Sequence, residues 1–288
     1  MLKLTSVLIF MAMIVSTYAQ NAVDLYPHGL RNQRSDVPIE DNAPQFFAYL
    51  PEGQPSEIAF LIIPGGGYAR VAIQHEGHDV AKRLQDLGYA AFVLRYRLPN
   101  AAQQYDKRIA PLQDAQSAIA YIRENFAKQG QIKHVGVLGF SAGGHLASTL
   151  STHFEMDSRT GKKAALALKP DFSVLLYPVI SMEDGITHNG SKNNLIGPNP
   201  AEGDVLKYSN GKNISRDTPP AFLMHAADDR VVPIANSERY LEALRANGVA
   251  GTLFRYETGG HGFGMYNKTD SRDWFEAMLR WVKDHFEE

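Results

Sequence analysis

One segment of the chain reads Val135-Gly136-Val137-Leu138-Gly139-Phe140-Ser141-Ala142-Gly143-Gly144-His145. Its first residues are apolar and typical of a buried strand, and the residues that follow Gly144 are typical of a helix. A serine at such a strand-to-helix turn, between residues small enough for a strained backbone, presents its hydroxyl at the carboxyl edge of a sheet. The positive end of the helix then faces any negative charge that forms there. The segment therefore predicts that Ser141 is a nucleophile.

Alternating strands and helices extend from this segment in both directions. Apolar runs closed by turn residues predict strands at residues 46–50, 58–63, 89–95, 172–177, 221–225 and 252–256. Apolar residues at spacings of three and four predict helices at residues 78–87, 111–126, 234–247 and 271–286. This alternation predicts an α/β fold, with a mainly parallel twisted sheet and helices on both faces. Catalytic groups in such folds gather at the carboxyl ends of the strands.

A base and a carboxylate for Ser141 are expected after the last two strands, because serine acyl transfer needs both. His261 lies among glycines in Gly259-Gly260-His261-Gly262-Phe263-Gly264, on a loop that can bring an imidazole to a substrate. Asp228 and Asp229 both follow the preceding strand, and both could instead be turn or capping residues. We assign the carboxylate to Asp229 and the other aspartate to the turn. The catalytic prediction is therefore Ser141, Asp229 and His261, in that order along the chain.

Donors for an oxyanion are expected in Pro64-Gly65-Gly66-Gly67-Tyr68, which ends an early strand. Consecutive glycines let backbone N–H groups approach a tetrahedral centre without interference from side chains. The predicted donors are the N–H groups of Ala142 and of Gly66 or Gly67. Tyr68 either lines the substrate pocket or packs in the interior. A phosphate cradle is disfavoured, because no Lys-Ser/Thr pair follows the glycines.

Two other features, the His-Glu-Gly-His run at residues 75–78 and the carboxylate of Asp114, are not assigned to the reaction. His75-Glu76-Gly77-His78 resembles a zinc motif, but its histidines are three positions apart where H-E-x-x-H places them four apart. We predict no metal there, and expect a helix start or a supporting role beside the glycine loop. Asp114, in the first turn after Pro111, is expected to be a solvated carboxylate that favours the helix dipole.

The composition limits the possible partners of the chain. The net charge of -2 over 288 residues gives no reason to expect nucleic acid or an anionic membrane. The absence of cysteine excludes disulfides, thiolate metal sites and a catalytic thiol. Residues 1–19 combine a positive start, an apolar run and small residues before Gln20, as in a cleaved export signal. We therefore expect a secreted or periplasmic protein with no membrane association after cleavage; the residues give no indication of oligomeric state.

The mature chain, residues 20–288, is expected to be a single domain. Residues 181–219 break the alternation of strands and helices, because they are polar and rich in Gly and Asn. They predict an insertion with at most a short helix near residues 202–208. The insertion lacks the long amphipathic helix of a lipase lid, which favours a small-molecule or polysaccharide-borne ester as substrate over a lipid droplet.

The sequence resembles the α/β-hydrolase superfamily of serine esterases. The resemblance rests on four segments, residues 139–147, 64–68, 226–233 and 259–264, and covers nearly all of the mature chain. More narrowly, the chain is similar to bacterial secreted carbohydrate acetyl esterases, often called acetylxylan esterases, through residues 75–77, 94–99 and 218–220.

The resemblance implies a serine esterase that removes short acyl groups, acetyl above all, from carbohydrate such as xylan, without cofactor or metal. A feruloyl esterase and a general short-chain carboxylesterase remain open as alternatives. A serine peptidase and a catalytically dead binding domain are less favoured, because there is no room for a propeller and both Ser141 and His261 are present.

Overall fold

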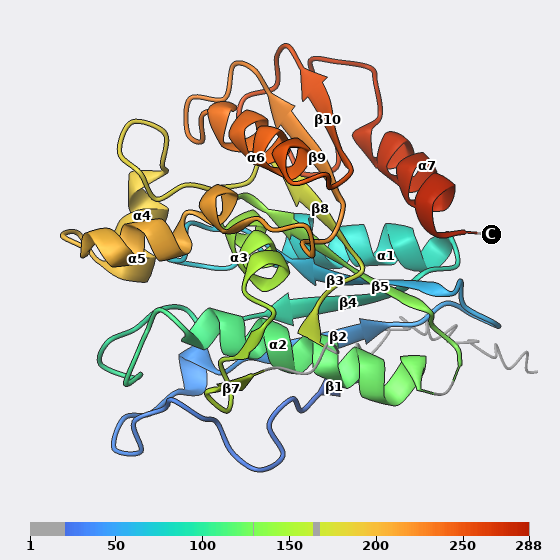
Figure 1. The fold of residues 1–288 in the computed structure, drawn as a ribbon. Coiled ribbons are helices and arrows are strands. Elements are labelled where there is room, and N and C mark those ends of the chain that lie inside the picture. Colours follow the sequence, from blue (N-terminus) through green and yellow to red (C-terminus); the bar gives the residue numbers. More distant parts are fainter. Residues whose placement is uncertain (1–20, 129, 164–167, 288) are drawn as a thin grey trace, which may run out of the picture.

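A computed structural model describes residues 21–128, 130–163 and 168–287 of the chain, and Figure 1 shows its fold. One sheet of eight strands has the spatial order β1-β2-β4-β3-β5-β8-β9-β10. Its strands are β1 (Asn21–Val23), β2 (Gln45–Tyr49), β3 (Ile58–Ile63), β4 (Ala90–Arg95), β5 (His134–Phe140), β8 (Phe172–Leu176), β9 (Ala221–Ala226) and β10 (Gly251–Tyr256). β6 (Met156–Asp157) and β7 (Lys162–Lys163) form a separate antiparallel pair.

The sheet is mainly parallel, as the sequence predicted. β2 runs antiparallel to both β1 and β4, whereas the neighbouring strands from β4 to β10 pair in parallel. In parallel register, Ile63 of β3 lies opposite Gly139 of β5, so the loops that follow these two strands start side by side. The glycine run after β3 and the turn at Ser141 are thereby placed at the same edge of the sheet.

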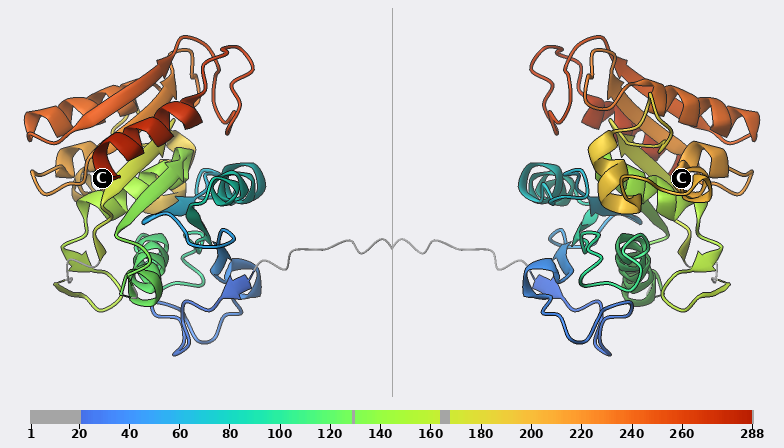
Figure 2. Two further views of the ribbon diagram at one scale, coloured as in Figure 1. Left: turned by 90° about the vertical axis from the view of Figure 1, so that its right-hand side faces the viewer. Right: turned by 90° about the vertical axis from the view of Figure 1, so that its left-hand side faces the viewer.

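Helices cover both faces of the sheet (Figures 1 and 2). They are α1 (Asp79–Asp86), α2 (Ala110–Ile122), α3 (Ser141–Thr152), α6 (Ala235–Ala246) and α7 (Trp274–Phe286), and a π-helical turn, Arg123–Ala127, follows α2. One apolar cluster contains buried residues of α2, α3 and α6, and a second contains those of α1 and α7. Every residue of β3 is buried, because alternate side chains enter the two clusters. This explains its uninterrupted apolar sequence.

The insertion is more helical than the sequence predicted. It contains α5 (Glu202–Tyr208), at the expected place, but also α4 (Asn189–Ile196) and a 3-10 turn, Asn210–Asn213. The expectation of at most one short helix was therefore wrong. α4 has little amphipathic pattern because its residues are mostly polar, and Leu195 and Ile196 supply its buried apolar end. Figure 1 shows α4 and α5 together at the left of the sheet.

Asp114 is the second correction, because it is completely buried. Its Oδ2 accepts the backbone N–H of Arg97 at 2.7 Å, and its Oδ1 accepts from Nη2 of the same arginine at 2.7 Å. The Tyr26 hydroxyl also donates to Oδ1. Helical position alone did not reveal this role, because the partners come from a distant strand end and from the N-terminal segment. Asp114 and Arg97 form a buried ion pair that ties α2 to the chain after β4.

No helix within the described residues is long and apolar enough to cross a membrane. The export signal expected at residues 1–19 lies outside the described part of the chain.

Candidate active site

Ser141 occupies a strained turn between β5 and α3. Its φ of 50° lies in the left-handed region, which a non-glycine residue seldom adopts. The turn is tight enough to require glycine on both sides. A Cβ on Gly139 would lie 2.4 Å from the Gly143 carbonyl oxygen, and a Cβ on Gly143 would lie 2.1 Å from the Ile63 carbonyl oxygen. These contacts explain the glycine spacing around the serine in physical terms.

The structure brings together the three side chains that the sequence singled out. His261, on the loop after β10, has its Nε2 2.9 Å from Ser141 Oγ. Its Nδ1 lies 2.6 Å from Oδ2 of Asp229, in the turn after β9. The three residues lie after three different strands but form one continuous chain of hydrogen bonds. This is the geometry that a serine nucleophile, a general base and an orienting carboxylate require.

Asp229 is held in its charged form by its surroundings. Its side chain is buried, and its Oδ1 accepts the backbone N–H groups of Val231 and Val232 at 2.9 Å each. The Nε2 of His225 lies 3.3 Å from Oδ2. Burial raises the pKa of Asp229, but hydrogen bonds from His225 and His261 outweigh it, so the pKa lies well below its usual value. A charged Asp229 favours a proton on Nδ1 of His261 and leaves Nε2 free to accept one.

Asp228 takes the turn role that the sequence gave to the second aspartate. Its Oδ1 accepts the backbone N–H of Gly260 at 2.8 Å. This contact joins the turn after β9 to the loop that carries His261. Asp228 therefore supports the position of the imidazole through the backbone of its loop.

The glycine loop lies directly against the serine. A Cβ on Gly65 would lie 2.9 Å from Ser141 Cβ. Gly66 and Gly67 both have positive φ, 124° and 68°, so this path of the backbone requires residues such as glycine. Within the described residues, the N–H groups of Gly66 and Gly67 have no acceptor. The N–H of Ala142 lies in the first turn of α3, where N–H groups have no partner within the helix. These are the groups predicted to bind an oxyanion.

Glu76 supports the glycine loop. For the His-Glu-Gly-His run, the sequence predicted either a helix start or such a supporting role. Glu76 is 3% exposed and lies in the π-helical turn Gln74–His78. Its Oε2 accepts the Gly65 N–H at 2.8 Å, and its Oε1 accepts the Tyr177 hydroxyl at 2.7 Å. No group of three or more side chains suited to a metal occurs within the described ranges.

Tyr68 and His145 pack together beneath the glycine loop. Tyr68 is 2% exposed, and its hydroxyl lies 2.8 Å from Nδ1 of His145. The other ring nitrogen of His145 lies 2.8 Å from the Tyr208 carbonyl oxygen. Of the two roles left open for Tyr68, its burial favours interior packing over contact with substrate.

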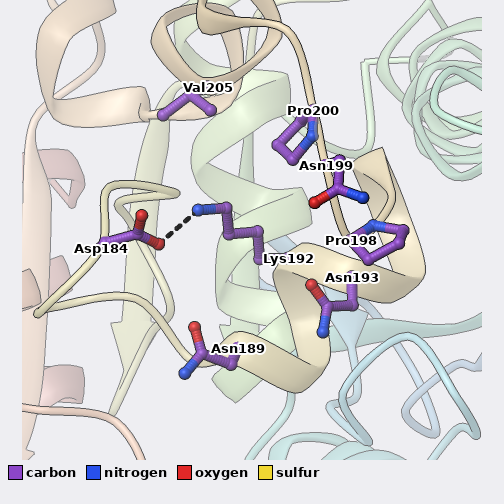
Figure 3. A pocket seen from close by; sticks show the side chains of 8 residues that line it. All are labelled: Asp184, Asn189, Lys192, Asn193, Pro198, Asn199, Pro200 and Val205. Atoms are coloured by element: carbon purple, nitrogen blue, oxygen red, sulfur yellow. Dashed lines mark hydrogen bonds and ion pairs between the residues drawn. The ribbon is translucent and has the colours of Figure 1, made fainter.

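A separate polar cleft of about 430 Å³ lies on the insertion (Figure 3). Asp184, Asn189, Lys192, Asn193, Pro198, Asn199, Pro200 and Val205 line it. Lys192 Nζ pairs with Asp184 Oδ1 at 2.5 Å. These are the two charged side chains of the lining, and their charges neutralise each other. The lining contains none of Ser141, Asp229 and His261. Its amide side chains offer donors and acceptors together, as a hydroxylated ligand requires.

Two residues of the site carried no usable signal in the sequence. Tyr177 ends a strand and reads as core, yet its ring packs edge-on against His261, with centroids 4.9 Å apart. Its φ of 34° marks a strained position. His188 lies in the polar insertion, without a motif around it, and only the fold places it beside Gly67. Contacts between distant segments define both roles, so periodicity and spacing could not predict them.

Comparison with known proteins agrees with this fold. The strand order, the turn at Ser141 and the solved relatives define an α/β-hydrolase fold. A family model described as BD-FAE matches residues 48–244, more than half of the chain, and the chain therefore belongs to the BD-FAE family.

Individual relatives act on esters or on xylan according to their names. The acetylxylan esterase of Xylanibacter ruminicola is 37% identical over 232 residues, covering 78% of this chain and 45% of that protein. The endo-1,4-beta-xylanase B of Butyrivibrio fibrisolvens is 32% identical over 233 residues, covering 80% of this chain and 36% of that protein. The chain thus spans less than half the length of these two curated relatives.

A solved structure covers the chain more completely. The acetyl ester-xyloside bifunctional hydrolase from Caldicellulosiruptor lactoaceticus has a TM-score of 0.80 and 35% identity. The alignment covers 92% of this chain and 96% of that one.

Proposed function

We propose that this chain is a serine carboxylesterase that removes short acyl groups, acetyl above all, from carbohydrate such as xylan. The observation that supports the esterase reaction best is the hydrogen-bond chain from Ser141 Oγ through His261 to Asp229, with distances of 2.9 and 2.6 Å. The names of the relatives support the acetyl group and the xylan.

The proposed reaction has two steps. Nε2 of His261 takes the proton of Ser141 as Oγ attacks the ester carbonyl carbon, and the backbone N–H groups of Gly66 or Gly67 and Ala142 bind the oxyanion. The carbon–oxygen bond to the sugar breaks, and the sugar oxygen receives that proton from His261. The products of this step are the free alcohol and an acetyl ester on Ser141.

Water completes the cycle by the same route. His261 takes a proton from water as it attacks the acyl-serine, and the tetrahedral centre then collapses. Acetic acid leaves, and Ser141 regains its proton. Asp229 stays ionised and stabilises the imidazolium in both steps. The chemistry uses the protein's own groups and water.

A substrate panel tests this function. It consists of p-nitrophenyl acetate, butyrate and palmitate, acetylated xylan, methyl ferulate and a peptide anilide. We expect the highest kcat/KM among the nitrophenyl esters on acetate, and release of acetate from acetylated xylan. Cleavage of methyl ferulate but not of acetylated xylan would make the protein a feruloyl esterase. Activity on the anilide alone would indicate a peptidase, and inertness throughout would indicate a binding domain.

We also propose that the chain is a single catalytic domain, residues 20–288, which acts outside the cytoplasm after loss of residues 1–19. The leader-like sequence supports export. The mass of the protein recovered from the periplasm or medium tests it, and should correspond to a chain that starts at Gln20. A full-length protein retained in the cytoplasm would contradict export.

A further inference from the structure

His188 connects the insertion to the reacting groups. It precedes α4, and its side chain is half-buried. A Cβ on Gly67 would lie 3.6 Å from His188 Cε1, so the imidazole lies over the predicted oxyanion loop. The same helix is fixed to that loop, because Asn194 Nδ2 donates to the Gly67 carbonyl oxygen at 2.8 Å. His188 is thus held next to Gly67, in the same loop as Gly65, whose Cβ would lie 2.9 Å from Ser141 Cβ.

The imidazole of His188 is neutral near neutral pH. Burial lowers its pKa, and the proximity of His261 lowers it further, while Asp229 has the opposite effect. A neutral imidazole carries its proton on one nitrogen only, so its hydrogen bonds identify the donor.

The contacts of Nδ1 place the proton on Nε2. The backbone N–H of Ser191 donates to Nδ1 at 3.2 Å, and Ser191 Oγ lies 2.8 Å from the same atom. Because a backbone N–H can only donate, Nδ1 is the acceptor and Nε2 carries the hydrogen. Among the described residues, no acceptor receives that N–H. The site therefore has an oriented donor, beside the glycine loop, that no protein group occupies.

An acetyl ester of a sugar offers this donor few acceptors. The acetyl carbonyl oxygen is already assigned to the backbone N–H groups of the glycine loop and Ala142, and the methyl group accepts nothing. The bridging ester oxygen receives its proton from His261 in the proposed reaction, so the remaining acceptors are the hydroxyl, ring and glycosidic oxygens of the sugar. These are neutral, as suits a neutral donor.

We propose that the Nε2–H of His188 donates a hydrogen bond to a sugar oxygen of the substrate, and so makes His188 a positioning residue for saccharide esters. This inference rests on the proposed function and adds the side chain that recognises the alcohol portion. Simple aryl esters lack the sugar oxygens, so His188 raises the preference for acetylated saccharides.

The test compares two substrates in His188→Asn. An Asn side chain still accepts from the backbone of Ser191, as a good N-cap does, but it is too short to replace Nε2–H. We measure kcat/KM for acetylated xylotriose and for p-nitrophenyl acetate. The ratio of the two should fall about fivefold in His188→Asn, since one neutral hydrogen bond contributes about 1 kcal/mol. The loss should come mainly as a higher KM for the saccharide. His188→Gln, whose amide N–H reaches farther, should restore part of the ratio.

Ser191→Ala is the matched control, because it removes the Oγ contact to Nδ1 but keeps the backbone contact and Nε2–H. Its ratio should equal that of the unmodified protein. An unchanged ratio in His188→Asn would overturn the inference while leaving the esterase function intact. A ratio that falls equally in Ser191→Ala would also overturn it, because the helix start alone would then explain the effect. Failure of the unmodified protein to cleave acetylated xylotriose would instead overturn the proposed function itself.

Discussion

The Tyr177 hydroxyl donates to Glu76 Oε1 at 2.7 Å and accepts the Gly264 N–H at 3.0 Å, so one buried side chain links the support of the glycine loop to the loop that carries His261. Glu76 holds the start of the glycine loop through Gly65, and Gly264 closes the loop that carries His261. The predicted oxyanion donors and the predicted base are therefore positioned by the same network. Burial, followed by the nearby Glu76 carboxyl group, raises the pKa of Tyr177 well above its usual value, so the tyrosine keeps the proton that it donates.

Replacing Glu76 by Gln should impair catalysis more than folding. A glutamine has one acceptor oxygen, so it cannot accept from both Gly65 and Tyr177. An unsatisfied buried group costs about 1–3 kcal/mol, and the loops should move apart. We expect kcat/KM on p-nitrophenyl acetate to fall about tenfold or more. Gln74→Ala, which removes an exposed contact to Asp79 in the same turn, is the control and should keep the kcat/KM. Normal activity of Glu76→Gln would show that the network does not position the site.

Replacing Asp114 by Ala should reduce stability with little change in kcat per folded molecule. The change leaves the Arg97 guanidinium buried and without its carboxylate. Removal of one partner of a buried ion pair costs about 3–5 kcal/mol. Urea unfolding measures this loss. Asp86→Ala breaks the exposed Lys82–Asp86 pair and should cost less than about 1 kcal/mol. Equal midpoints for the two variants would contradict the structural role of Asp114.

The stability of the protein should decrease in mild acid because of His145. Burial lowers the pKa of His145 to about 4 from an ordinary value of 6.5, so the folded protein keeps the imidazole neutral. Between these values the unfolded chain binds a proton that the folded chain does not. The free energy of unfolding therefore falls as the pH drops from 6.5 to 4, by about 3 kcal/mol from this group. Above pH 6.5 the contribution of His145 to the free energy of unfolding no longer changes with pH.

Urea unfolding at several pH values between 4 and 7 isolates this effect. His145→Gln should be less stable at pH 7. The slope of its free energy of unfolding against pH should be smaller, by the amount that corresponds to about one proton. Tyr68→Phe removes the hydroxyl partner of Nδ1 but retains the imidazole, and should retain the steep dependence. The same slope in His145→Gln and in the unmodified protein would refute the assignment.

The sequence predicted the positions of the polar side chains at strand ends better than the contacts between distant segments that stabilise the fold. Ser141, Asp229 and His261 each follow a strand in a parallel sheet, and such ends converge, so their proximity could be predicted from chain order. Their catalytic roles remain a prediction until they are measured. Asp114 was misjudged, because a helical position says nothing about an arginine that arrives from another segment. Helix α4 was missed because its residues are mostly polar, and the hydrogen bond from Asn194 to the Gly67 carbonyl oxygen joins segments that are far apart in the sequence.

In the proposed reaction, Ser141, activated by His261, attacks the carbonyl carbon of the ester. Mass spectrometry of the protein after reaction with diisopropyl fluorophosphate tests this most directly, because the reagent labels an activated serine at a nucleophilic site. We predict one adduct per chain, on the peptide that contains Ser141, with loss of ester hydrolysis in proportion to labelling and much slower labelling in His261→Ala. An adduct on a different residue, or an unlabelled Ser141 in a protein whose esterase activity is lost to the reagent, would contradict the account.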